Sequence, residues 1–115
     1  MSRAEPGQSA AVPEHLAPVF AALGDRTRLG LLSQLSTAEA RNISQLAEGS
    51  HLTRQGLTRH LQVLEDAGVV TSSRSGRERY FRLEPQPLRE MRDYLERVAQ
   101  HWDDTLLRLK NWVED

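Results

Sequence analysis

Apolar residues recur at every third or fourth position along most of the chain, which is the spacing of helices with one buried face. The first such segment begins near Pro13 and ends at Gly24, a residue type that favours helix termini. Its apolar positions are Leu16, Val19, Phe20 and Leu23. Pro18 lies inside this stretch, so either the helix kinks there or its regular part begins near Pro18.

A second helix is predicted immediately afterwards, with Asp25 as its N-cap. Its apolar face is expected to consist of Leu29, Leu32 and Leu35, with Leu31 beside them. The pattern breaks over residues 37–41. These two segments therefore predict a pair of short helices.

Two further helical segments with a tight join follow. The first ends at Gly49, and the second begins after Thr53, a natural N-cap, and stops at Gly68. Leu52 and Leu57 occupy the two places of a hydrophobic staple around that cap. The apolar positions are Ile43, Leu46 and Ala47 in the first segment and Leu57, Leu61 and Leu64 in the second. This arrangement predicts a helix–turn–helix.

The pattern changes to that of strands over residues 69–83. Residues 69–74 and 77–83 are predicted to form a β-hairpin around a tight turn at Ser75 and Gly76. Two strands alone are only marginally stable, so this hairpin must pack on the helices.

A long amphipathic helix is predicted after Pro85 and Pro87. Its apolar positions are Leu88, Met91, Leu95, Val98, Trp102, Leu106, Leu109 and Val113. A chain this small cannot cover so long a stripe by itself, so the stripe requires a partner. The whole order predicts a mainly α fold with a small β-hairpin, the winged helix, which presents one helix to the major groove of DNA and the hairpin to its backbone or minor groove.

Composition limits the possible chemistry. A chain of 115 residues corresponds to one domain, which we assign to residues 13–115 after a flexible tail at 1–12. The chain has no Cys, which excludes disulfides, thiolate metal sites and a Cys nucleophile. No apolar run approaches the roughly 20 residues that a membrane span needs, so we expect a cytoplasmic protein.

The charge distribution favours a nucleic-acid partner although the net charge of −1 does not. Residues 51–82 carry 6 Arg against 3 acidic residues, whereas residues 83–115 carry 5 basic against 8 acidic residues. The positive excess thus falls on the second helix of the helix–turn–helix and on the hairpin, or wing. Of the 15 basic residues 14 are Arg, the residue suited to bidentate pairing with phosphate or guanine.

Specific side chains are candidates for DNA contact in the predicted recognition helix, 53–67, and in the wing, 69–83. Four of them lie opposite the apolar stripe and are expected at base edges: Arg54, Gln55, Thr58 and Arg59. Thr53 and Ser50 suit phosphate. The alternative for these residues is an ordinary solvated face.

In the wing, the candidates are Arg74, Arg77 and Arg79. They can enter a minor groove or pair with phosphate, or else serve only to discourage strand-edge aggregation. The DNA interpretation is favoured for Arg77, and both remain open for Arg74 and Arg79.

Three stretches make the chain similar to the ArsR/SmtB family of winged-helix regulators. Residues 22–29 (ALGDRTRL) resemble the family's A-L-(A/G)-D-P-T-R motif, with Arg26 in place of Pro. Residues 43–47, 52–64 and 67–70 resemble its helix–turn–helix, and residues 76–77 and 80–83 its wing. The resemblance implies a two-fold homodimer built from the first and last helices. The interface residues are then Leu16, Val19, Phe20, Leu88, Met91, Leu95, Val98, Trp102, Leu106 and Leu109.

The chain departs from this family at its metal sites. Asn42 and Ser44 stand where the family's C-x-C thiolates lie, and Pro85 and Pro87 stand where its D-x-H motif begins. His101, with Asp104 a turn later, is more typical of a surface pair than of a metal site. The chain therefore resembles a Cys-free subgroup, and we predict no metal, no cofactor and an unknown effector. A ligand beside Met91, Tyr94 and Trp102 is conceivable, but these fit an interface core better.

The leading hypothesis is a dimeric, sequence-specific DNA-binding regulator, in the form of a repressor that reads an imperfect inverted repeat of double-stranded DNA. The alternative is a winged-helix module that binds a protein, because the fold alone does not decide between them. An enzyme is the least favoured class. The chain has no G-x-S-x-G motif and no Gly-rich phosphate loop, and the adjacent Asp103 and Asp104 point about 100° apart on a helix.

Overall fold

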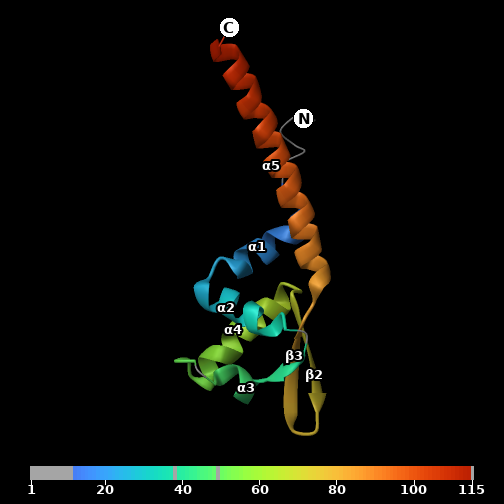
Figure 1. Ribbon diagram of the computed structural model, residues 1–115. Coiled ribbons are helices and arrows are strands. Elements are labelled where there is room, and N and C mark those ends of the chain that lie inside the picture. Colours follow the sequence, from blue (N-terminus) through green and yellow to red (C-terminus); the bar gives the residue numbers. More distant parts are fainter. Residues whose placement is uncertain (1–11, 38, 49, 115) are drawn as a thin grey trace.

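The computed structural model describes residues 12–37, 39–48 and 50–114. Its elements run from the N-terminus in the order η2 (Glu14–Leu16), α1 (Ala17–Leu23), α2 (Arg26–Leu35), β1 (Arg41–Asn42), α3 (Ile43–Ala47), α4 (Arg54–Asp66), β2 (Val70–Ser75), β3 (Glu78–Leu83) and α5 (Pro85–Glu114) (Figure 1). The predicted winged helix–turn–helix is confirmed. The predicted tail lies outside the described residues except for Val12, which is exposed.

The first helix resolves the position of Pro18. A short 3₁₀ turn, η2, precedes α1, and Pro18 occupies the first turn of α1. A proline there loses no hydrogen bond, because the first N–H groups of a helix have no acceptor within it. The regular helix thus starts near Pro18 and is not kinked by it.

The buried face of α2 differs from the prediction. Leu31, Leu32 and Leu35 are buried, whereas Leu29 is 51% exposed. The side of α2 that packs on α4 and β3 is centred between positions 31 and 35, and at 100° per residue Leu29 lies about 110° from that centre. The prediction that Leu29 belongs to the apolar face was therefore wrong.

The core is made by the inner sides of the helices and of the sheet. The residues within it that are no more than 1% exposed are Val19, Leu35, Leu46, Leu57, Leu61, Leu64, Val69, Val70 and Phe81. They include Leu57, Leu61 and Leu64, the predicted apolar stripe of α4. The spacing that predicted this helix therefore also predicted which of its sides is buried.

The sheet has one strand more than the predicted hairpin. β1 pairs antiparallel with β3, so the strand order is β1–β3–β2. The hairpin turn lies at Gly76 and Arg77, one residue later than predicted, because Ser75 still pairs with Glu78. Gly76 has a φ of +65°, a conformation that glycine adopts without strain. It therefore suits the first position of this two-residue turn.

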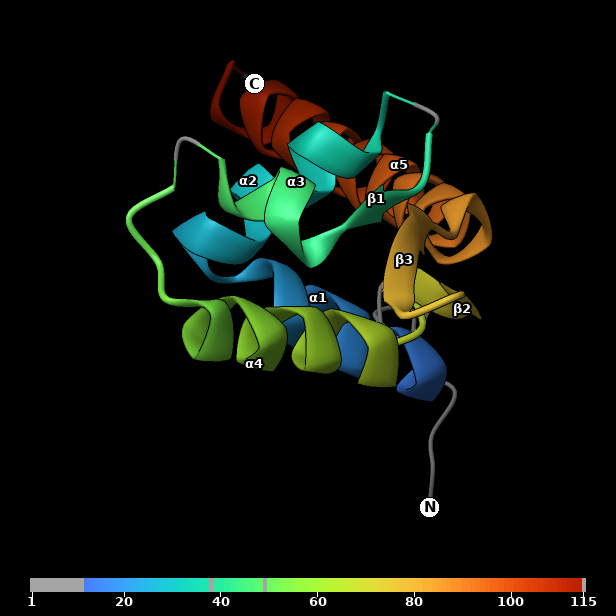
Figure 2. The same cartoon turned by 90° about the horizontal axis from the view of Figure 1, so that it is seen from below.

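Helix α5 begins at Pro85, a proline at the first helical turn, and ends near the C-terminus. Its first part packs beside η2 and α1, and its second part extends away from the remaining elements (Figure 1). The molecule is consequently elongated, with extents of 67 × 32 × 22 Å. The view from below shows α4 across one side, with the hairpin at its C-terminal end (Figure 2). Among the described helices, none is long and apolar enough to cross a membrane.

Candidate nucleic-acid interface

Helix α4 buries one apolar stripe and exposes the polar candidates for DNA contact. Leu57, Leu61 and Leu64 are completely buried. On the other side, the predicted base-reading residues and the N-cap are all exposed, namely Thr53, Arg54, Gln55, Thr58 and Arg59. The structure therefore places all five residues, exposed, at the N-cap and in the first two turns of one helix.

The start of α4 is fixed by hydroxyl groups. Thr53 Oγ1 accepts a hydrogen bond from the N–H of Gly56 at 2.9 Å, which confirms Thr53 as the N-cap. Ser50 Oγ accepts from the N–H of Leu52 at 3.0 Å and shapes the turn before the helix. Arg54 Nη1 donates to Ser44 Oγ of α3 at 3.2 Å and so bridges the two helices.

Gln55 and Arg59 differ from the other candidates at α4 in having no side-chain partner among the described residues. Thr58 Oγ1 donates to the carbonyl oxygen of Arg54 at 2.8 Å, so its hydroxyl proton is used within the helix. Within the described part of the chain, Gln55 and Arg59 form neither a side-chain hydrogen bond nor an ion pair. Their amide and guanidinium groups therefore keep their full capacity for an external partner.

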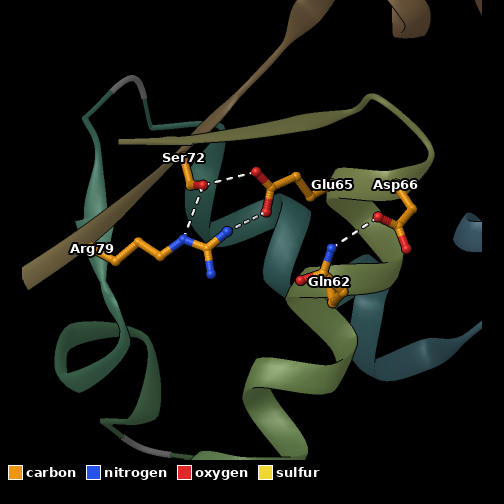
Figure 3. A network of polar contacts seen from close by, with 5 residues as sticks. All are labelled: Gln62, Glu65, Asp66, Ser72 and Arg79. Carbon is orange, nitrogen blue, oxygen red and sulfur yellow. Dashed lines mark hydrogen bonds and ion pairs between the residues drawn. The ribbon is translucent and has the colours of Figure 1, made fainter. Parts of the chain in front are cut away.

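The three wing arginines fall into two groups. Arg74 and Arg77 are exposed near the hairpin turn and have no side-chain partner among the described residues. Arg79 is engaged internally: its Nη2 lies 2.8 Å from Glu65 Oε1, its Nε donates to Ser72 Oγ at 3.0 Å, and its guanidinium carbon lies 5.1 Å from the centre of the Phe81 ring (Figure 3). These contacts engage Nε and Nη2 of Arg79, so its role as a DNA contact, which the sequence left open, stays a prediction.

A second internal arginine connects α4 to the beginning of α2. Arg28 Nε donates to the carbonyl oxygen of Ala22 at 2.6 Å, and its Nη1 lies 3.3 Å from Nδ1 of His60. Asp25 caps α2 by accepting from the N–H of Arg28 at 3.0 Å. This backbone hydrogen bond, aided by the charges of Arg28 and His60, holds the pKa of Asp25 below its ordinary 3.8 against an opposing effect of desolvation. His60 thus helps to pack α4 against the start of α2 through Nδ1.

Comparisons with known proteins agree with this geometry. A family model described as a helix-turn-helix domain matches residues 23–73. The chain is 38% identical over 102 residues to YuzN, an uncharacterized HTH-type transcriptional regulator of Bacillus subtilis, covering 84% of this chain and 92% of that one. The structure of this chain is similar to that of an ArsR-like transcriptional regulator from Rhodococcus sp. RHA1. The TM-score is 0.78 and the sequence identity 36%, and the match covers 87% of this chain and 91% of that one. The chain belongs to the ArsR/SmtB family.

Another relative of this ArsR/SmtB-family regulator is the transcriptional repressor SmtB of Mycobacterium tuberculosis. The two are 33% identical over 85 residues, which cover 74% of this chain and 61% of the repressor. The chain therefore spans less than two thirds of that relative.

The residues predicted to form the dimer interface of the regulator fall into different environments. Leu16 and Val19 are 2% and 1% exposed, and Met91 is also buried, so these three belong to the core of the single chain and offer almost no surface to a partner. Phe20 is half-buried and meets the Tyr94 ring edge-on at 5.7 Å. Leu88 and Val98 are half-buried against the core.

The exposed part of the α5 stripe is longer than the predicted interface. Leu95, Leu106 and Leu109 are half exposed and Trp102 is 58% exposed. Val113, which continues the stripe but was not assigned to the interface, is more exposed still, and Trp112 is exposed at the edge of the stripe. Leu107 is also exposed but points away from the stripe, since consecutive residues on a helix diverge by about 100°. The regulator thus presents a continuous apolar surface on the second half of α5.

The possible metal pair of the regulator has no third ligand nearby. Over residues 12–37, 39–48 and 50–114, no group of three or more His, Asp or Glu side chains is placed to hold a metal ion. Asp104 Oδ1 instead accepts from Gln100 Nε2 at 3.1 Å, an ordinary contact one turn apart on α5.

Proposed function

We propose that this ArsR/SmtB-family regulator is a homodimeric repressor that binds an imperfect inverted repeat in double-stranded DNA. The observation that carries the proposal is a pair of exposed side chains on α4, Gln55 and Arg59, that have no polar partner among the described residues. They lie beside a wing whose exposed Arg77 likewise has none there. An exposed polar helix face alone is common. Here, however, exposed side chains able to contact bases lie on the second helix of a helix–turn–helix and next to a basic wing, which is the geometry of DNA recognition.

Each element has a separate role in this proposal. Arg59 pairs with guanine and Gln55 with adenine in the major groove, where a good bidentate contact contributes roughly 1–3 kcal/mol of discrimination. The hydroxyls of Ser50 and Thr53 and the free N–H groups of α4 lie at the phosphates. Arg77 and Arg74 meet the backbone or minor groove and supply affinity that depends little on sequence.

The exposed stripe of α5 supplies the dimer contact. In a two-fold dimer the two copies of α4 are expected about 34–36 Å apart, one turn of DNA, so that both read one face of the duplex. A dimer seated on a promoter blocks access to it, and the similarity to the SmtB repressor supports this direction of regulation.

The test begins with selection of bound genomic fragments in vitro, followed by titrations of the selected site and of mismatched sites over a series of salt concentrations. Arg59→Ala and Gln55→Ala should flatten the preference between matched and mismatched sites. Arg77→Ala should weaken all sites alike and reduce the salt slope by about 1, because one phosphate contact is lost. Arg108→Ala, on the far part of α5, is the matched control and should change neither quantity.

Two results would contradict the proposal. Equal losses on every sequence from all three variants would refute the assigned roles of Gln55, Arg59 and Arg77. Absence of any shift of DNA at low salt would refute DNA binding itself and favour a module that binds a protein.

A further inference from the structure

A closed polar network joins the recognition helix to both strands of the wing (Figure 3). Ser72 Oγ of β2 donates to Glu65 Oε2 of α4 at 2.8 Å. Arg79 of β3 donates through Nε to Ser72 Oγ at 3.0 Å and through Nη2 to Glu65 Oε1 at 2.8 Å. Both carboxylate oxygens and two guanidinium nitrogens are used, so each residue of the network contacts the other two.

The register of the sheet explains why these side chains meet. Ser72 pairs with Phe81 on the neighbouring strand, so the two side chains lie on the same face of the sheet. Arg79 precedes Phe81 by two positions on β3 and therefore shares that face. Arg79 lies over the Phe81 ring, which is 1% exposed, while Glu65 reaches across from the last turn of α4.

The surroundings make this contact stronger than an ordinary surface ion pair. The side chains of Arg79 and Glu65 are only 37% and 27% exposed. A guanidinium held against an aromatic ring and donating a hydrogen bond to Ser72 loses less further freedom when it pairs with a carboxylate. Isolated exposed pairs gain little because they must order two mobile side chains, whereas here the order is already supplied.

The network lies near the base of the hairpin, where a small rotation produces a large displacement of the hairpin tip. From its base at Val70 to its turn at Gly76 the wing extends roughly 20 Å, at about 3.4 Å per residue. A rotation of the hairpin of about 10° at its base therefore displaces its tip by about 3.5 Å, more than the length of a hydrogen bond. If the angle between the hairpin and α4 were not fixed, the arginines at the tip of the hairpin would often lie away from the phosphates while Gln55 and Arg59 contact their bases.

We propose that Glu65, Ser72 and Arg79 form a positioning device that sets the angle between the recognition helix and the wing, so that both reach one DNA half-site together. This inference rests on the proposed function. Arg79 acts through the wing and does not contact DNA, and Glu65, an acidic residue on a DNA-binding element, raises the affinity for DNA.

The sharpest test is whether Glu65→Ala raises or lowers the affinity for DNA. Removal of a negative charge near DNA should strengthen binding if charge alone matters. The positioning role predicts the reverse: Glu65→Ala should weaken binding about three- to tenfold, because a free wing occupies the competent orientation for only a third to a tenth of the time. Glu78→Ala, an exposed acidic residue without a partner in the described chain, is the matched control and should leave affinity unchanged or raise it.

Arg79 is tested through the salt dependence and a double-mutant cycle. Arg79→Ala should lower affinity with the same salt slope as the parent, whereas Arg77→Ala reduces the slope by about 1. The double variant of Glu65 and Arg79 should bind no worse than either single variant, since one network is lost in all three. Thermal unfolding of each variant shows that the binding reactions are performed on folded protein.

The wing angle can also be measured without DNA. Because the chain has no Cys, Asp66→Cys and Ser75→Cys give two unique labelling sites on α4 and on the wing. The spin-label distance within one protomer should be narrowly distributed in the parent and broad after Glu65→Ala. An unchanged distribution, tighter DNA binding by Glu65→Ala, or a reduced salt slope in Arg79→Ala would overturn the inference. Absence of DNA binding by the parent would instead refute the proposed function, and the spin-label result would still decide the role of the network.

Discussion

The turn of the backbone at the end of the recognition helix is made at Gly68. Its φ is +86°, and its N–H bonds to the carbonyl oxygen of Glu65 at 3.0 Å, while the N–H of Val69 bonds to that of Leu64 at 3.1 Å. This pair of hydrogen bonds is the Schellman motif, and the buried side chains of Leu64 and Val69 accompany it. The chain turns here within three residues and enters β2.

We predict that Gly68→Ala lowers the free energy of unfolding by about 1–2 kcal/mol, because a residue with a Cβ is strained in the left-handed conformation. A Cβ at this position meets no atom within 4 Å, so the cost is backbone strain and not a clash. Gly30→Ala is the matched control within helix α2, where φ is ordinary and the space is also open. It should raise the free energy of unfolding by up to about 1 kcal/mol.

Urea denaturation of the parent and both variants measures the two changes. Opposite signs are expected. A loss of stability in Gly30→Ala as large as that in Gly68→Ala would show that space, and not the φ angle, governs both positions.

The side chains of α4 and of the wing show what sequence patterns can reveal about single residues. The apolar stripe of α4 placed Gln55 and Arg59 correctly on its exposed side, because burial on a helix follows from periodicity. The internal role of Arg79 could not be read in this way. Its partner Glu65 lies 14 positions earlier, and only the register of β2 and β3 brings the two together.

At the scale of elements, the boundaries predicted most accurately are those with a local chemical cause. Thr53 and Gly68 delimit α4 as predicted, through hydrogen bonds within a few residues of each other. Strand β1 was not predicted, because its two residues have no alternation of their own. It exists only through pairing with Tyr80 and Phe81. Likewise, the burial of Leu16 and Val19 in their own chain depends on how η2 packs on α5 and on how α1 packs on α2 and α4, which no local pattern contains.

Helix α5 allows the dimer contact to be tested with two adjacent leucines of equal exposure. Leu106 and Leu107 are each 57% exposed, but only Leu106 lies on the stripe, and Leu107 lies roughly 130° from its centre. Leu106→Glu should remove roughly 2 kcal/mol of apolar burial from each of the two copies in a dimer, which raises the dissociation constant about a thousandfold. Leu107→Glu should leave it nearly unchanged.

Sedimentation equilibrium at several protein concentrations measures both constants. Helical content by circular dichroism should be the same in the two variants, since the substituted positions are both exposed. Equal effects of the two substitutions, or a dimer unaffected by Leu106→Glu, would show that the stripe of α5 is not the interface.

At the scale of the whole molecule, the charges and the shape separate two tasks. The wing and the second half of α5 lie toward opposite ends of a molecule 67 Å long (Figure 1). The excess of 6 Arg over 3 acidic residues falls within residues 51–82, and the acidic excess falls on residues 83–115. A net charge near zero is therefore compatible with a strongly basic reading surface, because the compensating acids lie mainly on the helix that carries the apolar stripe.

A rigid dimer of this shape should tolerate only one spacing between its DNA half-sites. Five base pairs inserted between them rotate one half-site by about half a turn and move it by about 17 Å, so the second copy of α4 faces the wrong side of the duplex. Affinity should then fall to that of a single half-site. Ten inserted pairs restore the face but add about 34 Å, which a rigid α5 contact cannot span, so they should not restore binding.

The monomeric variant supplies the control for this experiment. Leu106→Glu should bind the original and both lengthened sites with the same low affinity, because its protomers read half-sites independently. Titration of the three DNA fragments with parent and variant gives all six affinities. Suppose that the parent binds the original site and the site lengthened by five base pairs equally well. The two recognition helices are then not held at a fixed distance, and a dimer formed by α5 would require a flexible joint between that helix and the wing.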